Sequence, residues 1–477
     1  MKRLVVIGGG ITGLAAAYRA QRLLEKPPFS GDAFEITLLE REERLGGKIL
    51  TEQEGDFLLE GAADSFLTRK PAALALCEEL GVVERLVGQL PQPIRSFVMH
   101  RHELYPLPEG FSGMVPTNLD ALLASPLLSQ AAKHRVKMEP TIPPDGPSGD
   151  ESIAHFMARR LGPEVFELLV EPLLSGIYAG DASALSLMAT FPRLREIERR
   201  SGSLLKGLAA EQSAATAAAK IDAPAAHPPF VTFPEGMGEL VRILTAGLTG
   251  VHIRTRTDVR AVEESDGGRY LISFRDGPAI AADAVVLATP AFVSAALVAR
   301  LDPALAELLA SIPFASVAII HLGFRRTDFG RPLEGYGYLI PQVEGSELLA
   351  CTWTSSKWEG RAPEDTVFVR LYAGRHGGEK VTERPDHALV ALARAELAAT
   401  LKVSAEPILS RVYRWERAMP QYTLGHLDRL AAIDGRVLAH RGLLLCGASY
   451  RGVGIPDCVE SGASAAAAAV DCLREAT

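Results

Sequence analysis

A glycine-rich segment close to the start of the chain has the spacing of a site for a phosphate-containing cofactor. Its residues are Gly8, Gly9, Gly10, Ile11, Thr12 and Gly13, which read G-x-G-x-x-G. The segment lies between a short apolar run with strand character, 3–7, and a run with helical spacing, 12–26. In that context the first glycine makes the turn, the second lets a pyrophosphate approach the backbone, and the third lets helix and strand pack closely. We expect a dinucleotide to bind here; the alternative is a structural glycine turn.

An acidic residue and a second glycine turn follow. Glu40 ends a second predicted strand, where its carboxylate can accept hydrogen bonds from ribose hydroxyls and repel a 2′-phosphate, which favours FAD or NAD over NADP. The next turn contains Gly46, Gly47 and Lys48. It offers another close backbone approach and a positive charge, which suits FAD, a long cofactor with two phosphates; a plain turn is the alternative. Arg41 belongs to the same expected cofactor site.

The elements that must position these residues alternate between strands and helices over 3–47. Helical patterns such as 71–80 and 152–174 follow, then an alanine-rich linker at 209–229, more strands, a helix at 386–401, and a buried strand at 442–447 before an alanine-rich helix at 460–474. We predict an α/β plus α+β fold with three parts. They are a Rossmann-like FAD-binding domain from 1–70, 225–300 and 411–477, a mainly helical insertion at 71–224 that forms a substrate entrance or a membrane-surface domain, and a mixed-sheet substrate domain at 301–410.

Composition excludes several classes of function. The 477 residues carry 50 basic and 58 acidic side chains, a net charge of −8, so nucleic acid is not an expected partner. The five cysteines are scattered without a C-x-x-C pair, which favours reduced thiols and no zinc site. The longest apolar stretch, 284–299, is shorter than the ~20 residues of a membrane span. We therefore expect a cytoplasmic protein without a metal, and contact with a membrane surface stays open.

The motifs resemble the flavin-dependent amine oxidase superfamily, which also contains phytoene desaturases and porphyrinogen oxidases. Four later segments resemble the bacterial oxygen-dependent porphyrinogen oxidases, in order and without an extra domain: 60–67, 172–181, 419–422 and 447–458. The G-I-Y-A-G-D and G-V-G-I-P-D sequences within them are specific to that group. One departure is Gly61-Ala62-Ala63-Asp64, where the group commonly has Gly-Pro-Asp-Ser; the missing proline frees one φ angle in this loop.

The resemblance implies a set of site residues. Gly61, Ala62, Ala63 and Asp64 would form a loop beside the flavin, Val259 would lie near the adenine, and Trp415 would pack on the flavin or in the core. The cofactor site would be completed by Gly447, Val453, Gly454, Ile455 and Pro456, whose backbone N–H groups would face the isoalloxazine edge and stabilise charge on reduction. Gly176, Tyr178 and Gly180 would border the substrate ring. Lys70 and Arg95 would bind propionates, with surface charge as the alternative for both.

The resemblance also implies the reaction: successive two-electron oxidations of a porphyrinogen, with hydride passing to the flavin and O₂ reoxidising it to give hydrogen peroxide. No acid–base pair beyond the flavin is expected, since the chain shows no Ser/His/Asp order and no H-E-x-x-H. Coproporphyrinogen III is the favoured substrate and protoporphyrinogen IX the alternative. A flavin amine oxidase, a carotenoid desaturase and a binder without flavin are more remote. Oligomeric state and hand-off of product to a ferrochelatase stay open.

Overall fold

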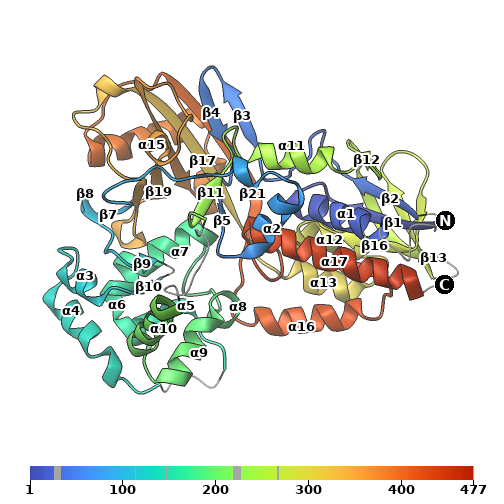
Figure 1. Cartoon of the computed structure of the whole chain (residues 1–477), viewed down its shortest axis with the longest axis horizontal. Helices are drawn as coiled ribbons and strands as arrows, with labels where there is room; N and C mark the ends of the chain where they lie inside the picture. Colours follow the sequence, from blue (N-terminus) through green and yellow to red (C-terminus); the bar gives the residue numbers. More distant parts are fainter. Residues whose placement is uncertain are drawn as a thin grey trace.

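Short runs of valine, leucine and isoleucine build a parallel five-stranded sheet. The computed structural model describes all residues except 26–33, 113, 145, 147–148, 219–226, 266–267 and 476–477, so part of the predicted alanine-rich linker lies outside the described residues. The strand order is β12-β2-β1-β16-β22 and every pairing is parallel. The strands are β1 (Lys2–Ile7), β2 (Phe34–Leu39), β12 (Val251–Arg254), β16 (Ala284–Leu287) and β22 (Leu443–Leu445). Three distant stretches of chain therefore share one sheet (Figure 1).

Two different layers cover this sheet. Alternate residues of β1 point to opposite faces, so Leu4 and Val6 pack in one hydrophobic cluster and Val5 and Ile7 in another. The first cluster contains the helices α1 (Ile11–Leu24), α2 (Pro71–Glu79), α11 (Gly238–Ala246) and α17 (Ile455–Glu475). The second contains β13 (Val259–Ser265), β14 (Arg269–Phe274), β15 (Ile280–Ala282), α12 (Ala291–Val298), α13 (Pro303–Ala310) and α16 (His426–Val437). The final helix thus returns to the first, and it begins at Ile455, five residues before the predicted start.

A seven-stranded mixed sheet forms the second large layer. Its order is β21-β17-β20-β19-β18-β7-β8. The strands are β7 (Phe97–His100), β8 (Glu103–Pro106), β17 (Phe314–Arg325), β18 (Gly337–Leu339), β19 (Leu348–Trp353), β20 (Thr366–Ala373) and β21 (Leu409–Pro420). Helix α15 (Asp386–Leu401) packs against one face, as the apolar residues of β17, β19 and β20 join its leucines in one cluster. Strands β7, β8 and β21 extend the sheet beyond residues 301–410.

Short helices form a third body beside this sheet (Figure 1). They are α3 (Leu119–Ala124), α4 (Gln130–Lys137), α5 (Ile153–Leu161), α6 (Pro163–Val165), α7 (Glu171–Tyr178), α8 (Leu187–Thr190), α9 (Pro192–Ser201) and α10 (Leu204–Ala218). The continuous helical pattern expected at 152–174 is divided. Gly162 has a φ of 93°, Pro163 follows it, and 166–170 form a π-helical turn. Proline cannot supply the N–H that would continue the preceding helix, so the chain starts a new one.

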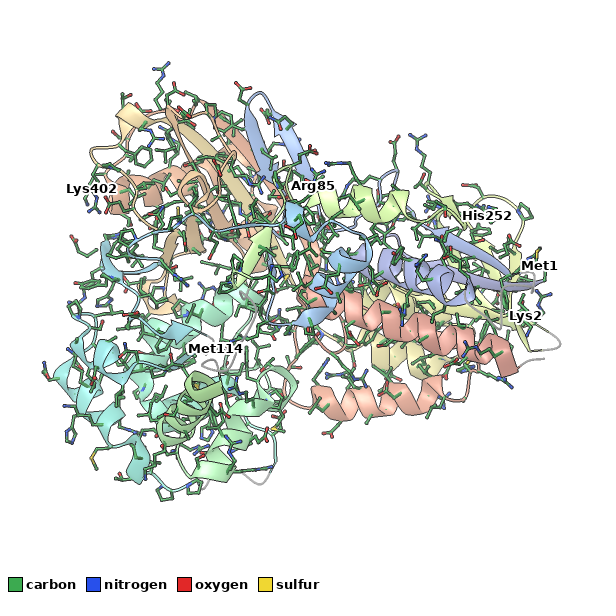
Figure 2. All side chains as sticks on the ribbon, in the orientation of Figure 1. Met1, Lys2, Arg85, Met114, His252 and Lys402 are labelled. Atoms are coloured by element: carbon green, nitrogen blue, oxygen red, sulfur yellow. The ribbon has the colours of Figure 1, made fainter. Side chains whose placement is uncertain are left out.

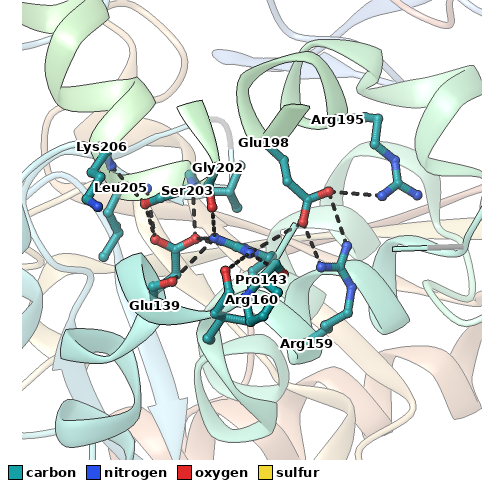
Figure 3. Close-up of polar contacts among 12 residues, drawn as sticks. Glu139, Pro143, Arg159, Arg160, Arg195, Glu198, Gly202, Ser203, Leu205 and Lys206 are labelled. Carbon is teal, nitrogen blue, oxygen red and sulfur yellow. Dashed lines mark hydrogen bonds and ion pairs between the residues drawn. The ribbon is translucent and has the colours of Figure 1, made fainter. Parts of the chain in front are cut away.

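A buried ionic cluster holds the helical body together (Figure 3). Glu139, just after α4, accepts hydrogen bonds from Arg160 Nε at 2.7 Å and from the N–H of Leu204 at 2.9 Å. Glu198 of α9 pairs with Arg159 at 2.6 Å and with Arg195 at 2.9 Å. Glu139, Arg160 and Glu198 are fully buried. Because a buried charge is tolerated only when it is paired, these contacts fix how α5, α9 and α10 pack.

Smaller sheets complete the fold. They are β3 (Thr51–Glu54) with β4 (Phe57–Glu60), β5 (Phe66–Leu67) and β6 (Val87–Gly88) on either side of β11 (Phe230–Thr232), and β9 (Phe111–Ser112) with β10 (Val115–Pro116). Figure 2 shows Arg85 at the junction of the parallel sheet and the mixed sheet, where its Nε lies 2.6 Å from Glu239 Oε1. The predicted combination of a Rossmann-like domain, a mixed sheet and a helical region is confirmed. In the described part of the chain, no helix is both long and apolar enough to cross a membrane.

Candidate cofactor and substrate site

In the glycine segment after β1, one glycine has almost no protein atoms near the position that a side chain would take. Gly8 has a φ of 107°, and a Cβ there would lie 2.8 Å from the carbonyl oxygen of Ala288. A Cβ on Gly13 would lie 1.8 Å from the carbonyl oxygen of Gly8. A Cβ on Gly10 would meet only the Cα of Gly47, at 3.9 Å. Gly8 and Gly13 are therefore required by the fold, while the free approach to Gly10 suits the pyrophosphate of a dinucleotide.

Glu40 connects the glycine segment to the next strand. Its Oε2 accepts the N–H of Gly9 at 2.7 Å, and its Oε1 accepts the N–H of Glu42 at 2.8 Å. Its carbonyl oxygen accepts the N–H of Thr257 at 2.8 Å, which brings the segment leading to Val259, the first residue of β13, beside it. Glu40 thus stands between the glycine segment and the residue expected at the adenine.

The second glycine turn is locked to the first. The N–H of Gly46 donates to the carbonyl oxygen of Gly9 at 2.8 Å, and Arg44 holds the far side of the turn by donating to the carbonyl oxygen of Ile49 at 3.1 Å. Arg41 is exposed and pairs with Glu42 at 2.8 Å, away from these glycines. The turn therefore depends on Arg44, while Arg41 contributes no contact to it.

Lys48 follows this turn and directs its ammonium group into the protein. Its Nζ donates to the carbonyl oxygen of Ala418, close to the end of β21. Burial lowers the pKa of Lys48, and the interaction with the thiol of Cys458 in α17 opposes that shift. Lys48 thus places a positive group where the turn at Gly46 and Gly47, strand β21 and the start of α17 meet.

The loop 61–64 is fixed at both ends. Trp415 Nε1 donates to the carbonyl oxygen of Gly61 at 2.7 Å. Asp64 accepts hydrogen bonds from Lys357 Nζ at 2.9 Å and Trp358 Nε1 at 3.1 Å, and Arg370 Nη2 lies 3.6 Å away. Burial alone would raise the pKa of Asp64, but the charges of Lys357 and Arg370 hold it well below its usual range. These contacts replace the restraint lost with the proline, and Ala62 and Ala63 lie half-buried between them.

The segment after β22 closes onto the dinucleotide cradle. Gly447 has a φ of 118°, its N–H donates to Ser461 Oγ at 2.9 Å, and a Cβ there would lie 3.7 Å from Thr12 Oγ1. Helix α17 crosses α1 at the same place, since a Cβ on Gly462 would lie 2.2 Å from the carbonyl oxygen of Thr12. The structure therefore brings Gly447 and Thr12, two residues predicted to bind the cofactor, close together.

The rest of this segment forms a glycine turn, defined here as residues 447–454. The N–H of Gly452 donates to Tyr422 Oη at 2.7 Å, and the N–H of Gly454 donates to Asp457 Oδ2 at 3.1 Å. Ile455 and Pro456 start α17, and Val453 packs against the hydrophobic cluster of the helical body. The glycine turn therefore lies between the cofactor domain and the helical body.

The three residues expected at the substrate ring lie at the end of α7. Gly176 is exposed, and a Cβ there would lie 3.9 Å from Leu339 Cδ2 in β18, on the sheet face opposite α15. Tyr178 is buried, and burial raises its pKa. A Cβ on Gly180 would lie 2.6 Å from Gln421 Oε1. Gly176 thus has little protein on the side where a Cβ would stand, whereas Gly180 faces a side chain of the chain itself, that of Gln421. Contact of these residues with the substrate ring stays a prediction.

The two candidate propionate ligands have different surroundings. Lys70 Nζ lies 2.6 Å from Asp457 Oδ1 and 2.8 Å from Oδ2, beside the glycine turn, and about half of its side chain is exposed. Arg95 is exposed, just before β7, and its carbonyl oxygen accepts the N–H of Tyr336 at 2.7 Å. The structure joins Lys70 to the C-terminal part of the site, and it gives Arg95 a backbone contact to the mixed sheet.

A polar group on the mixed sheet was missed by sequence reasoning. Tyr372 Oη accepts Arg370 Nε at 2.6 Å and lies 3.3 Å from Thr352 Oγ1. Tyr372 pairs across the sheet with Ala350, which pairs with Leu339, so it lies in the row of residues below Gly176. The strand alternation of 366–373 could have placed Arg370 and Tyr372 on one face. It could not have shown that this face turns inward.

No group of three metal-ligating side chains occurs among the described residues. The site consists of the cradle of glycines, Glu40 and Lys48, and of the face of the mixed sheet that lies opposite α7. These features fit a dinucleotide cofactor that extends from Glu40 toward the glycine turn. The assignment of individual residues to cofactor and substrate stays a prediction.

Comparison with known proteins adds an independent observation. The sequence pattern of flavin-containing amine oxidoreductases matches residues 11–470. The chain is 33% identical to coproporphyrinogen III oxidase of Bacillus subtilis over 99% of its own length and 98% of that protein, and 32% identical to the Staphylococcus aureus enzyme of the same name over 98% of each. A crystal structure of a putative protoporphyrinogen oxidase from Exiguobacterium superposes with a TM-score of 0.84 at 33% identity, covering 99% of both chains.

Proposed function

The chain belongs to the family of flavin-containing amine oxidoreductases, and we propose that it oxidises coproporphyrinogen III to coproporphyrin III, with FAD as cofactor and O₂ as electron acceptor. The observation that carries the proposal is the end-to-end similarity to two proteins named coproporphyrinogen III oxidase. The resemblance drawn from the motifs is thereby confirmed at the level of the family, and the protein is a flavin-dependent oxidoreductase.

The cradle supports the choice of FAD. Gly10 would approach the pyrophosphate, Glu40 would accept hydrogen bonds from the ribose, and Lys48 would supply a positive group further along the cofactor. FAD bound there would supply the redox chemistry, which is two-electron oxidation of the substrate by hydride transfer with O₂ as the final acceptor. The chain's own part is to hold the cofactor and a large ring in register and to exclude water. Trp415 and Asp64 serve this by fixing both ends of the loop 61–64.

The substrate would lie between α7 and the mixed sheet. Gly176 leaves room above Leu339, and the half-buried Tyr372 and Thr352 place hydroxyl groups on the same sheet face. Four propionates would require cations at the rim of this space. Lys70 supports that requirement, because its ammonium already binds a carboxylate, that of Asp457, and is accessible enough to exchange it for a propionate.

Protoporphyrinogen IX is the second candidate substrate. One specific observation favours it: the Exiguobacterium structure, similar over the whole chain, is described as a putative protoporphyrinogen oxidase. The two substrates share the ring and differ in the number of propionates. The flavin would therefore oxidise both in the same way, while Lys70 and Arg95 would bind them to different extents.

The test is to follow porphyrin fluorescence and oxygen uptake together on the purified yellow protein. Removing six electrons in two-electron steps consumes about three O₂ and yields about three hydrogen peroxide for each porphyrin formed. That ratio with either porphyrinogen supports the proposal. A flavin-loaded protein that oxidises neither porphyrinogen would contradict it, and amines and polyenes would then be tried.

We also propose that the reaction takes place in the cytoplasm and that the porphyrin passes to a ferrochelatase, with the helical body free to touch a membrane surface. The five cysteines are free thiols, which supports a reducing compartment. A planar porphyrin with its four nitrogens available is the substrate for metal insertion, which supports the hand-off. A co-sedimentation assay with anionic vesicles tests the membrane contact, and recovery of all protein in the supernatant would exclude it.

A further inference from the structure

The segment 419–422, which reads M-P-Q-Y, has no part in the function derived so far, although its last two residues are among the most buried polar groups of the protein. Gln421 has no exposed surface and Tyr422 is 1% exposed. Buried polar side chains in such positions are retained for the hydrogen bonds they make. Their partners lie on two different parts of the site.

Gln421 contacts the end of α7. Its Nε2 donates to the carbonyl oxygen of Tyr178 at 2.8 Å and to that of Met419 at 3.0 Å. Its Oε1 lies 2.6 Å from the position that a Cβ on residue 180 would take, so a side chain there would clash with it. The amide therefore fixes the backbone at the point where α7 ends and the G-I-Y-A-G-D sequence turns.

Tyr422 contacts the glycine turn. Its hydroxyl donates to the carbonyl oxygen of Ala448 at 2.6 Å and accepts the N–H of Gly452 at 2.7 Å. One phenol thus closes the turn by joining its two halves. His426 stacks on the Tyr422 ring with centroids 4.3 Å apart, and its Nε2 lies 2.8 Å from the carbonyl oxygen of Tyr450. Burial lowers the pKa of His426. Because a carbonyl oxygen can only accept, Nε2–H is the donor to Tyr450.

The backbone of this segment is itself held in place. The N–H of Gln421 donates to the carbonyl oxygen of Pro313 at 2.9 Å, and the carbonyl oxygen of Tyr422 accepts the N–H of Ser186 at 2.8 Å. The two side chains consequently extend from a fixed point, one to the end of α7 and the other to the glycine turn.

We propose that Gln421 and Tyr422 are positioning residues for the reaction, which together set the end of α7 and the direction of the N–H groups of the glycine turn. The inference rests on the proposed function in placing the flavin ring beside this turn. The N–H groups of Gly447, Gly452 and Gly454 bond within the chain, so any donor to the flavin would come from the other N–H groups of the turn. Such donors would stabilise the negative charge of a reduced flavin, and a turn that Tyr422 holds closed would keep them aligned. Gln421 acts on the other side, on the part of α7 that borders the substrate.

The test compares Tyr422→Phe with Tyr270→Phe as flavin-loaded proteins. Tyr270, in strand β14, is a matched control. It is 2% exposed, and its hydroxyl donates to the backbone carbonyl of Arg441 at 2.9 Å. Tyr422→Phe is expected to make the flavin midpoint potential more negative and to shift the flavin absorbance bands. Its kcat should fall about tenfold while its KM changes less than about twofold. Tyr270→Phe should keep the wild-type midpoint and spectrum.

Gln421→Met provides the second arm. It keeps the volume of the side chain and removes both donors, so KM should rise several-fold with a smaller change in kcat and a wild-type midpoint. A Tyr422→Phe holoenzyme with the midpoint and spectrum of the wild type would overturn the proposal. So would a Gln421→Met protein with wild-type KM.

If Tyr422→Phe is recovered without flavin, 3,5-difluorotyrosine at position 422 replaces it. The ring and its contacts then stay, but the oxygen becomes a weaker acceptor for the N–H of Gly452, and an unchanged midpoint and spectrum contradict the proposal. The midpoint is measured by dye equilibration without substrate. A protein that oxidises no porphyrinogen therefore refutes the proposed function and leaves this test standing.

Discussion

At the scale of single residues, Gly13 and Gly10 of the first motif have separable roles. Gly13→Ala places a Cβ 1.8 Å from the carbonyl oxygen of Gly8, so we expect it to prevent folding. Gly10→Ala meets no protein atom closer than 3.9 Å and should keep the fold, but it should weaken FAD binding by at least about tenfold, because the methyl group occupies the pyrophosphate side. Circular dichroism and flavin titration check the two variants. A Gly10→Ala protein that binds FAD with wild-type affinity contradicts the placement of the cofactor.

Lys70 and Arg95 carry the prediction on substrate charge. Lys70→Ala and Arg95→Ala should each raise KM for the substrate with four propionates about three- to fivefold, and less for the substrate with two, because an exposed ion pair contributes less than about 1 kcal/mol. Steady-state kinetics on both porphyrinogens check this, with Lys137→Ala, exposed at the end of α4, as the control. Equal KM values for all three variants and the wild type on both substrates would exclude these residues as propionate ligands.

A site residue could be predicted from the sequence when its partners lie close to it along the chain. Gly8, Gly10, Gly13 and Glu40 were predicted because their roles follow from neighbours within one strand–helix–strand unit. The role of Asp64 was not, because its donors Lys357 and Trp358 are almost 300 residues away in the chain. A family motif can mark such a residue, but only the fold shows that its carboxylate is used internally.

At the scale of elements, Asp302 joins α13 and α16, two helices that pack against the parallel sheet. It caps α13 by accepting the N–H of Leu305 at 3.0 Å, and it accepts Arg436 Nη2 at 2.6 Å and lies 3.0 Å from His440 Nε2, both contributed by α16 and the turn after it. The hydrogen bonds from Arg436 hold the pKa of Asp302 well below its usual range, against the effect of burial. A depressed native pKa means that the ionised carboxylate stabilises the fold above about pH 4 and that this contribution is lost as the pH falls through the native pKa.

Asp302→Ala should therefore lower the free energy of unfolding at pH 7 by about 1–2 kcal/mol, through loss of the cap and its hydrogen bonds. The difference from the wild type should shrink as the pH is lowered from 5 to 2. Urea unfolding at several pH values measures it. The matched control is Asp434→Asn, which removes an exposed ion pair of α16 with Arg451 and should change stability by less than about 0.5 kcal/mol. A difference in the free energy of unfolding that stays constant down to pH 2 would show that the charge of Asp302 does not contribute to stability.

Element boundaries show where periodicity suffices and where it fails. The helix expected at 386–401 matches α15, since a long uninterrupted pattern fixes its ends. The pattern at 152–174 continued through Gly162 and Pro163, because apolar spacing alone does not record a backbone break with a φ of 93°. The start of α17 was predicted late because Ile455 and Pro456 read as part of a glycine-rich bend.

At the scale of the whole molecule, the last helix closes the fold against the first. A Cβ on Gly462 of α17 would lie 2.2 Å from the carbonyl oxygen of Thr12 and 3.1 Å from the nitrogen of Ala16, so the two helices touch along their backbones. Gly462→Ala should lower the free energy of unfolding by about 2–3 kcal/mol by forcing α1 and α17 apart. Thermal and urea unfolding check this.

Gly435 provides the control for that substitution. It lies inside α16, and a Cβ there meets nothing within 4 Å. Gly435→Ala should raise stability by about 0.5–1 kcal/mol, since alanine loses less conformational entropy in a helix. If Gly462→Ala were as stable as Gly435→Ala, the close crossing of the two helices would be contradicted.

The sequence predicted the main parts of the molecule better than the way in which they pair with one another. The parallel sheet, the mixed sheet and the helical region each follow from local patterns. The order of the seven-stranded sheet does not, because β7 comes from before the helical body and pairs with β18, more than 200 residues later, while β8 pairs with β7 at the edge. Nothing in the alternation of a short strand identifies a partner at that distance.

The proposed substrate of this flavin enzyme is a porphyrinogen with four propionates. The most direct measurement is the ratio of kcat/KM for coproporphyrinogen III to that for protoporphyrinogen IX, determined side by side on one preparation. We expect coproporphyrinogen III to be preferred by about tenfold or more, as two additional propionates find cations at the rim. A ratio below one would contradict the claim and assign the protein to protoporphyrinogen IX.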